Sequence, residues 1–232
     1  MKIISFKICP FVQRVTALLE AKGLDYEIDY IDLNNKPLWF LDLSPHGQVP
    51  ILVTGAGSVL FESEAIMEYI DDVTPALESN VGAEQRAVNR AWSYLAAKNY
   101  LVQCSTMRST DAATFQERVA KLNKAFATIE NALADGPYFN GEELGNVDIA
   151  WTPLLHRADI VRRHTGFDFF ADYPKLRQWQ AALLKREFVQ TSVAADFEQK
   201  FVDFYLSANT CLGRGLEEDQ PVPVNAKTSA CC

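Results

Sequence analysis

The sequence has few basic residues and no long apolar run. It contains 22 Lys and Arg against 30 Asp and Glu among 232 residues, a formal net charge of −8. A chain of this charge repels nucleic acid phosphates and anionic lipid surfaces, so we expect neither as a partner. No apolar stretch approaches the ~20 residues needed to cross a bilayer, and residues 1–7 lack the apolar segment and cleavage site of a signal peptide. We therefore expect a cytoplasmic protein that does not contact membranes.

The cysteines are few, odd in number and scattered. They are Cys9, Cys104, Cys211, Cys231 and Cys232. None belongs to a Cys-x-x-Cys pair, and no group of Cys and His residues has the spacing of metal ligands. The sequence therefore predicts neither a disulfide framework nor a metal site. A reducing compartment such as the cytosol, where thiols stay reduced, fits this pattern.

Strand and helix patterns alternate in the first third of the chain. We expect strands at 2–8, 26–33, 48–53 and 59–61, a helix at 11–22 and another that begins with Ser63 as its N-cap. The β-α-β opening makes its two strands parallel, and the later pair forms a hairpin around Gly55 and Gly57. The sequence thus predicts an α/β domain over residues 1–78.

Beyond residue 80 the apolar residues recur at helical spacing. We expect helices at 83–109, 113–135, 148–164, 174–185 and 192–207. No strand pattern of comparable quality follows, so the second domain is predicted to be all-helical, over residues 84–210. The last residues, 211–232, are rich in Pro, Gly and acidic side chains, a composition typical of a flexible tail.

Residues 8–14 have the clearest chemical pattern. Cys9 stands between an apolar run and a helical pattern, and Pro10 suits the first position of a helix because its missing N–H costs nothing there. At a helix N-terminus the unpaired N–H groups and the positive end of the macrodipole stabilise a thiolate. This predicts a reactive cysteine. The alternative is a small apolar Cys that happens to precede a helix.

Four motifs, in order and in register, connect the chain to a known family, and the first contains Cys9. They are residues 9–11 followed by Arg14, then 35–40, 47–50 and 61–63. Together they resemble the omega class of cytosolic glutathione transferases and its bacterial relatives. The resemblance extends through about residue 78 and continues in outline to about residue 207. It implies a thioredoxin-like α/β N-terminal domain followed by an all-α C-terminal domain, and the family's usual homodimer.

The resemblance implies a chemistry for Cys9. In such proteins the cysteine thiolate forms a mixed disulfide with glutathione. Val12 stands where a dithiol enzyme has its second cysteine, so a second glutathione would have to resolve the disulfide. The implied activity is glutathione-dependent thiol transfer and reduction. It includes deglutathionylation and extends to dehydroascorbate reduction or cleavage of glutathionyl ketones, with glutathione as cosubstrate and no metal.

The resemblance also implies a glutathione site. Val49 would pair its backbone with the cysteinyl part of the tripeptide, through a cis bond to Pro50. Ser63 and the helix N-terminus would bind the γ-glutamyl carboxylate, Glu62 the ammonium group, and Lys36 the glycyl carboxylate. Each residue also has a structural alternative: an edge-strand proline, simple helix capping, or a solvated surface charge.

A second pocket for a small electrophile or a glutathionylated substrate is expected beside the cysteine. Phe11, Tyr94, Tyr100, Cys104 and Met107 are the residues we expect to line it, although aromatic side chains of this kind are more often part of a core.

Two other functions remain open from the sequence. One is a non-catalytic protein on the same fold, similar to transcription-associated starvation proteins or to intracellular chloride-channel-like proteins. The other is classical conjugation to aryl halides or epoxides. Conjugation is disfavoured because it uses a Ser or Tyr hydroxyl that leaves the glutathione thiolate available, whereas a cysteine traps it as a disulfide.

Overall fold

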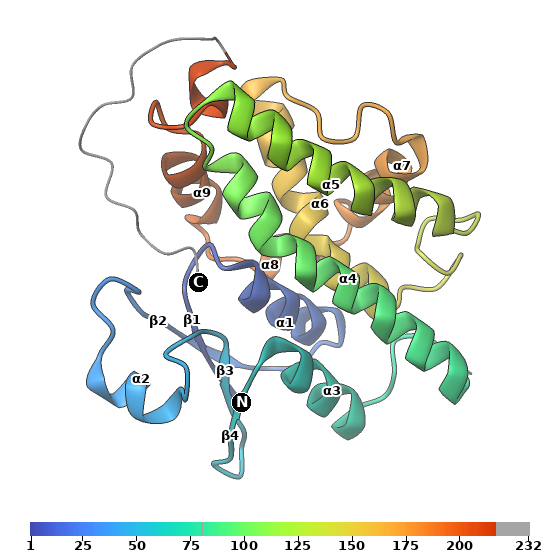
Figure 1. Ribbon diagram of the computed structural model, residues 1–232. Helices are drawn as coiled ribbons and strands as arrows, with labels where there is room; N and C mark the ends of the chain where they lie inside the picture. The colour runs from blue at the N-terminus through green and yellow to red at the C-terminus, as the bar shows by residue number, and fades with distance from the viewer. Residues whose placement is uncertain (80, 217–232) are drawn as a thin grey trace.

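The computed structural model describes residues 1–79 and 81–216. Its first part is a four-stranded sheet with three helices (Figure 1). The elements are β1 (Lys2–Ser5), α1 (Pro10–Ala21), β2 (Glu27–Tyr30), α2 (Leu38–Leu43), β3 (Ile51–Val53), β4 (Val59–Phe61) and α3 (Ser63–Val73). The strand order is β2-β1-β3-β4, with β1 parallel to β2 and antiparallel to β3, and β3 antiparallel to β4. This topology confirms the predicted crossover and hairpin.

Helix α1 is the structural centre of the molecule. Its side chains Val15, Leu18 and Leu19 are fully buried, as is Ile3 of β1. α1 packs beside α3, and it also contacts α4, α6 and α8 of the helical part. Figure 1 shows α1 between the sheet and the helices above it. The residue that opens this helix therefore lies at the junction of the two parts of the chain.

The second part of the described chain is helical. Its elements are α4 (Ala83–Met107), α5 (Ala112–Ala132), α6 (Asn146–Thr165), α7 (Pro174–Leu183), α8 (Glu187–Thr191), α9 (Phe197–Tyr205) and a 3-10 turn η1 (Leu212–Arg214). α4 packs along both α5 and α6 (Figure 1). The helix expected over 192–207 is shorter in the structure: residues 192–196 form turns and α9 begins at Phe197. The short helix α8 before it was not predicted. No helix within the described residues is long and apolar enough to cross a membrane.

Helix α6 is the core helix of this part, and Asp148 fixes its start. The Asp148 carboxylate accepts hydrogen bonds from Gly145 N (2.8 Å), Phe139 N (2.8 Å) and Trp179 Nε1 (2.6 Å). Gly145 is the N-cap residue, so a carboxylate in the first turn satisfies an N–H group that would otherwise lack a partner. The same carboxylate joins α6 to α7 and to the preceding loop.

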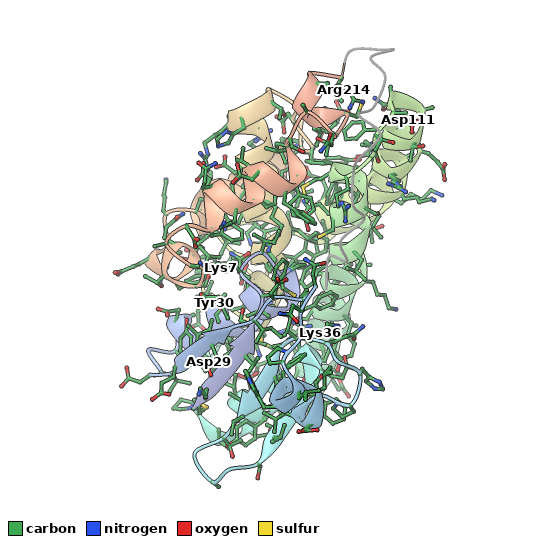
Figure 2. The ribbon with its side chains drawn as sticks, turned by 90° about the vertical axis from the view of Figure 1, so that its left-hand side faces the viewer. Lys7, Asp29, Tyr30, Lys36, Asp111 and Arg214 are labelled. Atoms are coloured by element: carbon green, nitrogen blue, oxygen red, sulfur yellow. The ribbon has the colours of Figure 1, made fainter. Side chains whose placement is uncertain are left out.

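The expected tail differs from the structure at its beginning. Cys211 and Leu212 are each 1% exposed. Cys211 N donates to Ser109 O at 2.7 Å, and the Arg214 guanidinium donates to the Thr110 carbonyl. Figure 2 shows Arg214 beside Asp111, where η1 meets the start of α5. The start of this segment therefore packs against the α4–α5 connection, where the side chains of Cys211 and Leu212 are buried. The rest of the expected tail, including Cys231 and Cys232, lies outside the described residues.

Candidate functional site

Cys9 is the N-cap residue of α1. Its backbone is extended, with φ −74° and ψ 123°, and Pro10 follows as the first helical residue. Cys9 N donates to Phe6 O at 3.0 Å, and Cys9 O accepts from Gln13 N at 3.1 Å. The thiol therefore stands at the positive end of the helix, as the sequence predicted. Cys9 is only 1% exposed, so a reagent reaches its sulfur only after neighbouring groups move.

The segment before β3 forms one wall of the site. The Val49–Pro50 peptide bond is cis, which confirms the expected conformation. Ser44 Oγ donates to Gln48 O and accepts from Gln48 N, both at 2.9 Å, and so closes the turn. Lys36 Nζ donates to Gly47 O at 2.7 Å. These bonds fix the backbone on both sides of Gly47, whose φ of +60° suits glycine.

The start of α3 forms the opposite wall. Ser63 is the first helical residue, and Glu62, not Ser63 as predicted, occupies the N-cap position. Glu62 has φ +67°, an uncommon conformation for a residue with a side chain, which costs about 1–3 kcal/mol and is concentrated at functional sites. Ser63 is 2% exposed, and its Oγ donates to Glu64 Oε2 at 3.2 Å. The first-turn N–H groups of α3, together with this hydroxyl, suit an anion.

Between these walls lies a pocket of about 120 Å³ that is open to solvent. It brings together five residues that the sequence predicted for the site: Phe11, Val49, Pro50, Glu62 and Ser63. Six further lining residues were not predicted: Ser44, Pro45, His46, Gln48, Phe61 and Leu101. Most of these lie within or next to the predicted motifs, and that proximity along the chain is the feature by which the sequence could have indicated them. Leu101 lies on α4, far along the chain, and no local pattern marks it.

Lys36 and Cys9 lie near this pocket but are not among its lining residues. Lys36 is held to Gly47, two residues before Val49. Cys9 is two residues before Phe11, and it lines a separate small crevice together with Lys7 and Tyr30. Lys7 Nζ forms an ion pair with Asp196 at 2.7 Å and lies 5.4 Å from the Tyr30 ring centroid. Figure 2 shows Lys7 beside Tyr30, where the sheet meets the helices.

The structure contradicts the expectation that three residues of α4 line the electrophile pocket. Tyr100, Cys104 and Met107 are 0%, 1% and 0% exposed and belong to the core. Burial raises the pKa of Tyr100, which therefore stays protonated and donates to the Ala150 carbonyl of α6. Cys104 Sγ accepts from Tyr205 Oη at 3.2 Å. These side chains face inward because α4 packs this stripe against α6.

The other two residues of that expectation lie on different surfaces. Tyr94 is 40% exposed and lines a separate cavity between α3 and α4, which includes Arg14 and Asn146. Phe11 lines the site pocket, and its ring packs edge-on against Tyr100 with centroids 5.0 Å apart. Of the five expected residues, the structure therefore brings only Phe11 to the site.

An ion pair joins the two helices that begin at the site. Arg14 of α1 is 2% exposed, and its Nη1 lies 2.9 Å from Glu64 Oε1 of α3. Glu64 also accepts from Ser63, so Arg14, Glu64 and Ser63 form one polar chain. Among residues 1–79 and 81–216, no group of three or more His, Cys, Asp or Glu side chains is arranged to hold a metal ion.

A mixed four-stranded sheet, a cysteine at the start of its first helix and an appended helical bundle define a two-domain protein of the thioredoxin-like class. Two family models match the chain: "Glutathione S-transferase, N-terminal domain" over residues 8–73 and "Glutathione S-transferase, C-terminal domain" over residues 112–182. A rice protein named "Probable glutathione S-transferase DHAR1, cytosolic" is 31% identical over 192 residues, 81% of this chain and 85% of that protein. The chain belongs to the glutathione S-transferase family.

Further relatives narrow the class. Pig glutathione S-transferase omega-1 is 29% identical over 188 residues, covering 80% of this chain and 77% of its own. The crystal structure of glutathione transferase Omega 3C from Trametes versicolor matches with a TM-score of 0.72 and 28% identity, over 83% of this chain and 88% of that one. Rice GST1 in complex with glutathione gives a TM-score of 0.76 and 27% identity, over 90% and 95% of the two chains. These findings confirm the omega-like resemblance, the fold class and a glutathione-dependent enzyme.

Proposed function

We propose that this protein catalyses glutathione-dependent thiol transfer and reduction, with Cys9 as the nucleophile. The observation that supports this most is the pocket lined by Val49, Pro50, Glu62 and Ser63, which opens between the start of α3 and the residues that follow Cys9. A helix N-terminus beside a cysteine and a second helix N-terminus beside an anion pocket are what a thiolate and a carboxylate ligand need.

The proposed reaction has two disulfide exchanges. The Cys9 thiolate attacks the glutathione sulfur of a mixed disulfide; a bond forms between Cys9 and that sulfur, and the substrate thiolate leaves and takes a proton from water. The thiolate of a second glutathione then attacks the glutathione sulfur bound to Cys9. Oxidised glutathione leaves, and the Cys9 thiolate is restored. Over the cycle one free glutathione is consumed: the mixed disulfide and this glutathione become the substrate thiol and oxidised glutathione.

The proposed binding mode uses one residue for each end of glutathione. The γ-glutamyl carboxylate would accept from the first N–H groups of α3 and from Ser63 Oγ, while Glu62 would bind the ammonium group. The Val49 backbone would pair with the cysteinyl residue. Lys36 would bind the glycyl carboxylate, for which its Nζ must exchange the Gly47 carbonyl for the ligand.

The proposed cycle uses one cysteine of the protein, with no second cysteine to resolve the mixed disulfide on Cys9. Val12, one helical turn from Cys9, is 4% exposed and has no thiol. Cys104 and Cys211 are each 1% exposed in the helical part, where Cys104 contacts Tyr205 and Cys211 contacts the α4–α5 connection. The described residues therefore offer no accessible second thiol beside Cys9, and external glutathione is the proposed resolving agent.

The substrates, assembly and location of the protein are also proposals. The omega and DHAR names of the relatives favour deglutathionylation and dehydroascorbate reduction as the activities to examine first. We propose a homodimer, as the family resemblance implies. We propose a cytosolic location, in line with the name of the rice relative.

Oxidised glutathione tests the nucleophile directly. Wild-type protein and Cys9→Ser are incubated with oxidised glutathione, the intact proteins are weighed, and the adduct is mapped by peptide. We expect a glutathione adduct on Cys9 of the wild type and none at residue 9 of the variant. Cys211→Ser, which removes an equally buried thiol, is the matched control and should retain the adduct. A wild-type protein without glutathione on Cys9 would contradict the proposal.

A further inference from the structure

Arg157 is a fully buried cation in the middle of α6. It is 0% exposed, and every acceptor that it contacts is a neutral oxygen. Nη2 donates to Ile8 O at 3.1 Å, while Nη1 donates to Pro153 O at 3.1 Å and to Gln13 Oε1. Its guanidinium carbon lies 5.3 Å from the Phe197 ring centroid. Within residues 1–79 and 81–216, Arg157 forms no ion pair with a carboxylate.

A buried charge of this kind requires compensation. Burying an unpaired ion is costly, and buried arginines are accordingly found paired. The other deeply buried arginine near the site, Arg14, follows this rule through Glu64. Arg157 instead directs one nitrogen at the carbonyl of Ile8, the residue covalently joined to Cys9. The Arg157 guanidinium therefore lies beside the backbone that leads directly into Cys9.

The neighbours of Arg157 hold it in this place. Arg157 only donates hydrogen bonds, so the Gln13 atom facing it must be the amide oxygen. The Gln13 amide nitrogen then faces His156 Nδ1, 2.9 Å away, and His156 must accept as a neutral ring. His156 stacks on Phe197, with ring centroids 5.4 Å apart. α6 therefore holds both the first turn of α1 and the backbone before Cys9.

The remaining charges around Cys9 form pairs. Lys7 pairs with Asp196 at 2.7 Å, and Arg14 pairs with Glu64 at 2.9 Å. The other titratable groups that face this region from the packed elements are neutral at pH 7, the buried ring of His156 and the phenols Tyr30 and Tyr100. Arg157 therefore contributes positive charge that the other groups do not cancel.

We propose that Arg157 is a positioning residue that stabilises the Cys9 thiolate from the helical domain. It acts through two contacts, the hydrogen bond to Ile8 O, which orients the backbone before the thiol, and the bond to Gln13 Oε1 in the first turn of α1. Its uncompensated charge favours the negative sulfur over the neutral thiol. The inference rests on the proposed function only in taking Cys9 as the reactive group.

The pH dependence of Cys9 alkylation tests this role. The rate of modification by iodoacetamide, followed by peptide mapping at residue 9, is measured from pH 4 to pH 10 in the wild type and in Arg157→Met. Without the cation we expect the midpoint of the rate profile to rise by about one pH unit or more. At any pH below the wild-type midpoint, the variant should then react about ten times more slowly than the wild type. Arg157→Lys, which restores the charge, should recover most of the shift. Arg163→Met, an exposed position on the same helix, should leave the profile unchanged.

Arg157→Met removes three buried hydrogen bonds, which could prevent folding, so a second variant tests the same role with Arg157 retained. Gln13→Glu keeps the size of the side chain and gives Arg157 a carboxylate partner, so it should raise the midpoint in the same direction while Arg157 stays in place. Circular dichroism and thermal unfolding verify that each variant is folded.

The outcomes separate the two proposals. If Cys9 reacts and its midpoint is unchanged in folded Arg157→Met or in Gln13→Glu, Arg157 has no such role, and the proposed function stands. If wild-type Cys9 neither alkylates nor takes up glutathione, the proposed function fails and the inference fails with it.

Discussion

Acidification is expected to destabilise the folded protein through His156. The ring is 4% exposed, stacks on Phe197 and accepts from Gln13 Nε2 at Nδ1. Burial, and secondarily the charge of Arg157, lowers the pKa of His156 to about 4 from its ordinary 6.5. The unfolded chain therefore binds a proton at this residue below pH 6.5, whereas the folded protein does so only near pH 4.

The sign and size of the effect follow from proton linkage. Between pH 6.5 and pH 4 the unfolded state holds more protons, so the free energy of unfolding falls as the pH falls. The difference between a pKa of 6.5 in the unfolded chain and about 4 in the folded protein corresponds to about 3 kcal/mol. This contribution is fully present above pH 6.5 and is lost by pH 4. A typical domain has a free energy of unfolding of only about 5–15 kcal/mol, so this contribution is a large part of the total.

Urea unfolding at half-unit intervals from pH 4 to pH 7.5 measures this term. His156→Gln lacks the titrating ring, so its free energy of unfolding should fall by about 3 kcal/mol less than that of the wild type over this range. Other acidic and basic groups titrate in both proteins and cancel in the difference. His46→Gln, which removes an exposed histidine, is the matched control and should keep the wild-type slope. Equal slopes for the wild type and His156→Gln would refute the reasoning.

Two further predictions concern the start of α6 and the proposed glutathione pocket. Asp148→Ala leaves the buried donors Gly145 N, Phe139 N and Trp179 Nε1 without an acceptor. We therefore expect the free energy of unfolding in urea to fall by about 3–6 kcal/mol. A fall below about 1 kcal/mol would show that water replaces the carboxylate. Ser63→Ala removes a hydroxyl that is not the helix cap, so the fold should persist while glutathione binding in calorimetry weakens about tenfold or more, the effect of losing a hydrogen bond to a charged group. An unchanged dissociation constant would exclude Ser63 from the site.

The α/β part was predictable because its signals are local. The strands alternate or form short apolar runs, α1 begins at Cys9-Pro10, and the hairpin between β3 and β4 has two glycines at its turn. The expected cis bond before Pro50 is present. What the sequence did not reveal is the helix cap: a serine at the start of an apolar pattern favours Ser63 as the cap, but the positive φ of Glu62 makes Glu62 the cap.

The inward face of α4 could not be read from its sequence. Its exposed side includes the apolar Val88, Tyr94 and Leu101, and its buried side includes polar residues such as Gln103 and Thr106. Apolar residues therefore do not mark one face. Tyr100, Cys104 and Met107 were expected at a pocket because the helical domain was expected to line it, yet this stripe packs against α6.

The network around Arg157 was equally hidden in the sequence. Gln13 and His156 are far apart along the chain, and neither belongs to a motif of charged or catalytic residues. They meet because α1 packs on α6, a contact fixed by the tertiary structure. Buried polar side chains that join two domains have no periodic signal, since each is surrounded by apolar neighbours on its own helix.

The steady-state rate of reduction of a glutathionylated peptide tests the central claim most directly. The assay contains excess glutathione and compares the wild type with Cys9→Ser and with the control Cys211→Ser. If Cys9 is the nucleophile, Cys9→Ser should fall to the rate of the uncatalysed exchange while Cys211→Ser retains wild-type turnover. A folded Cys9→Ser protein that turns over at the wild-type rate would contradict the claim.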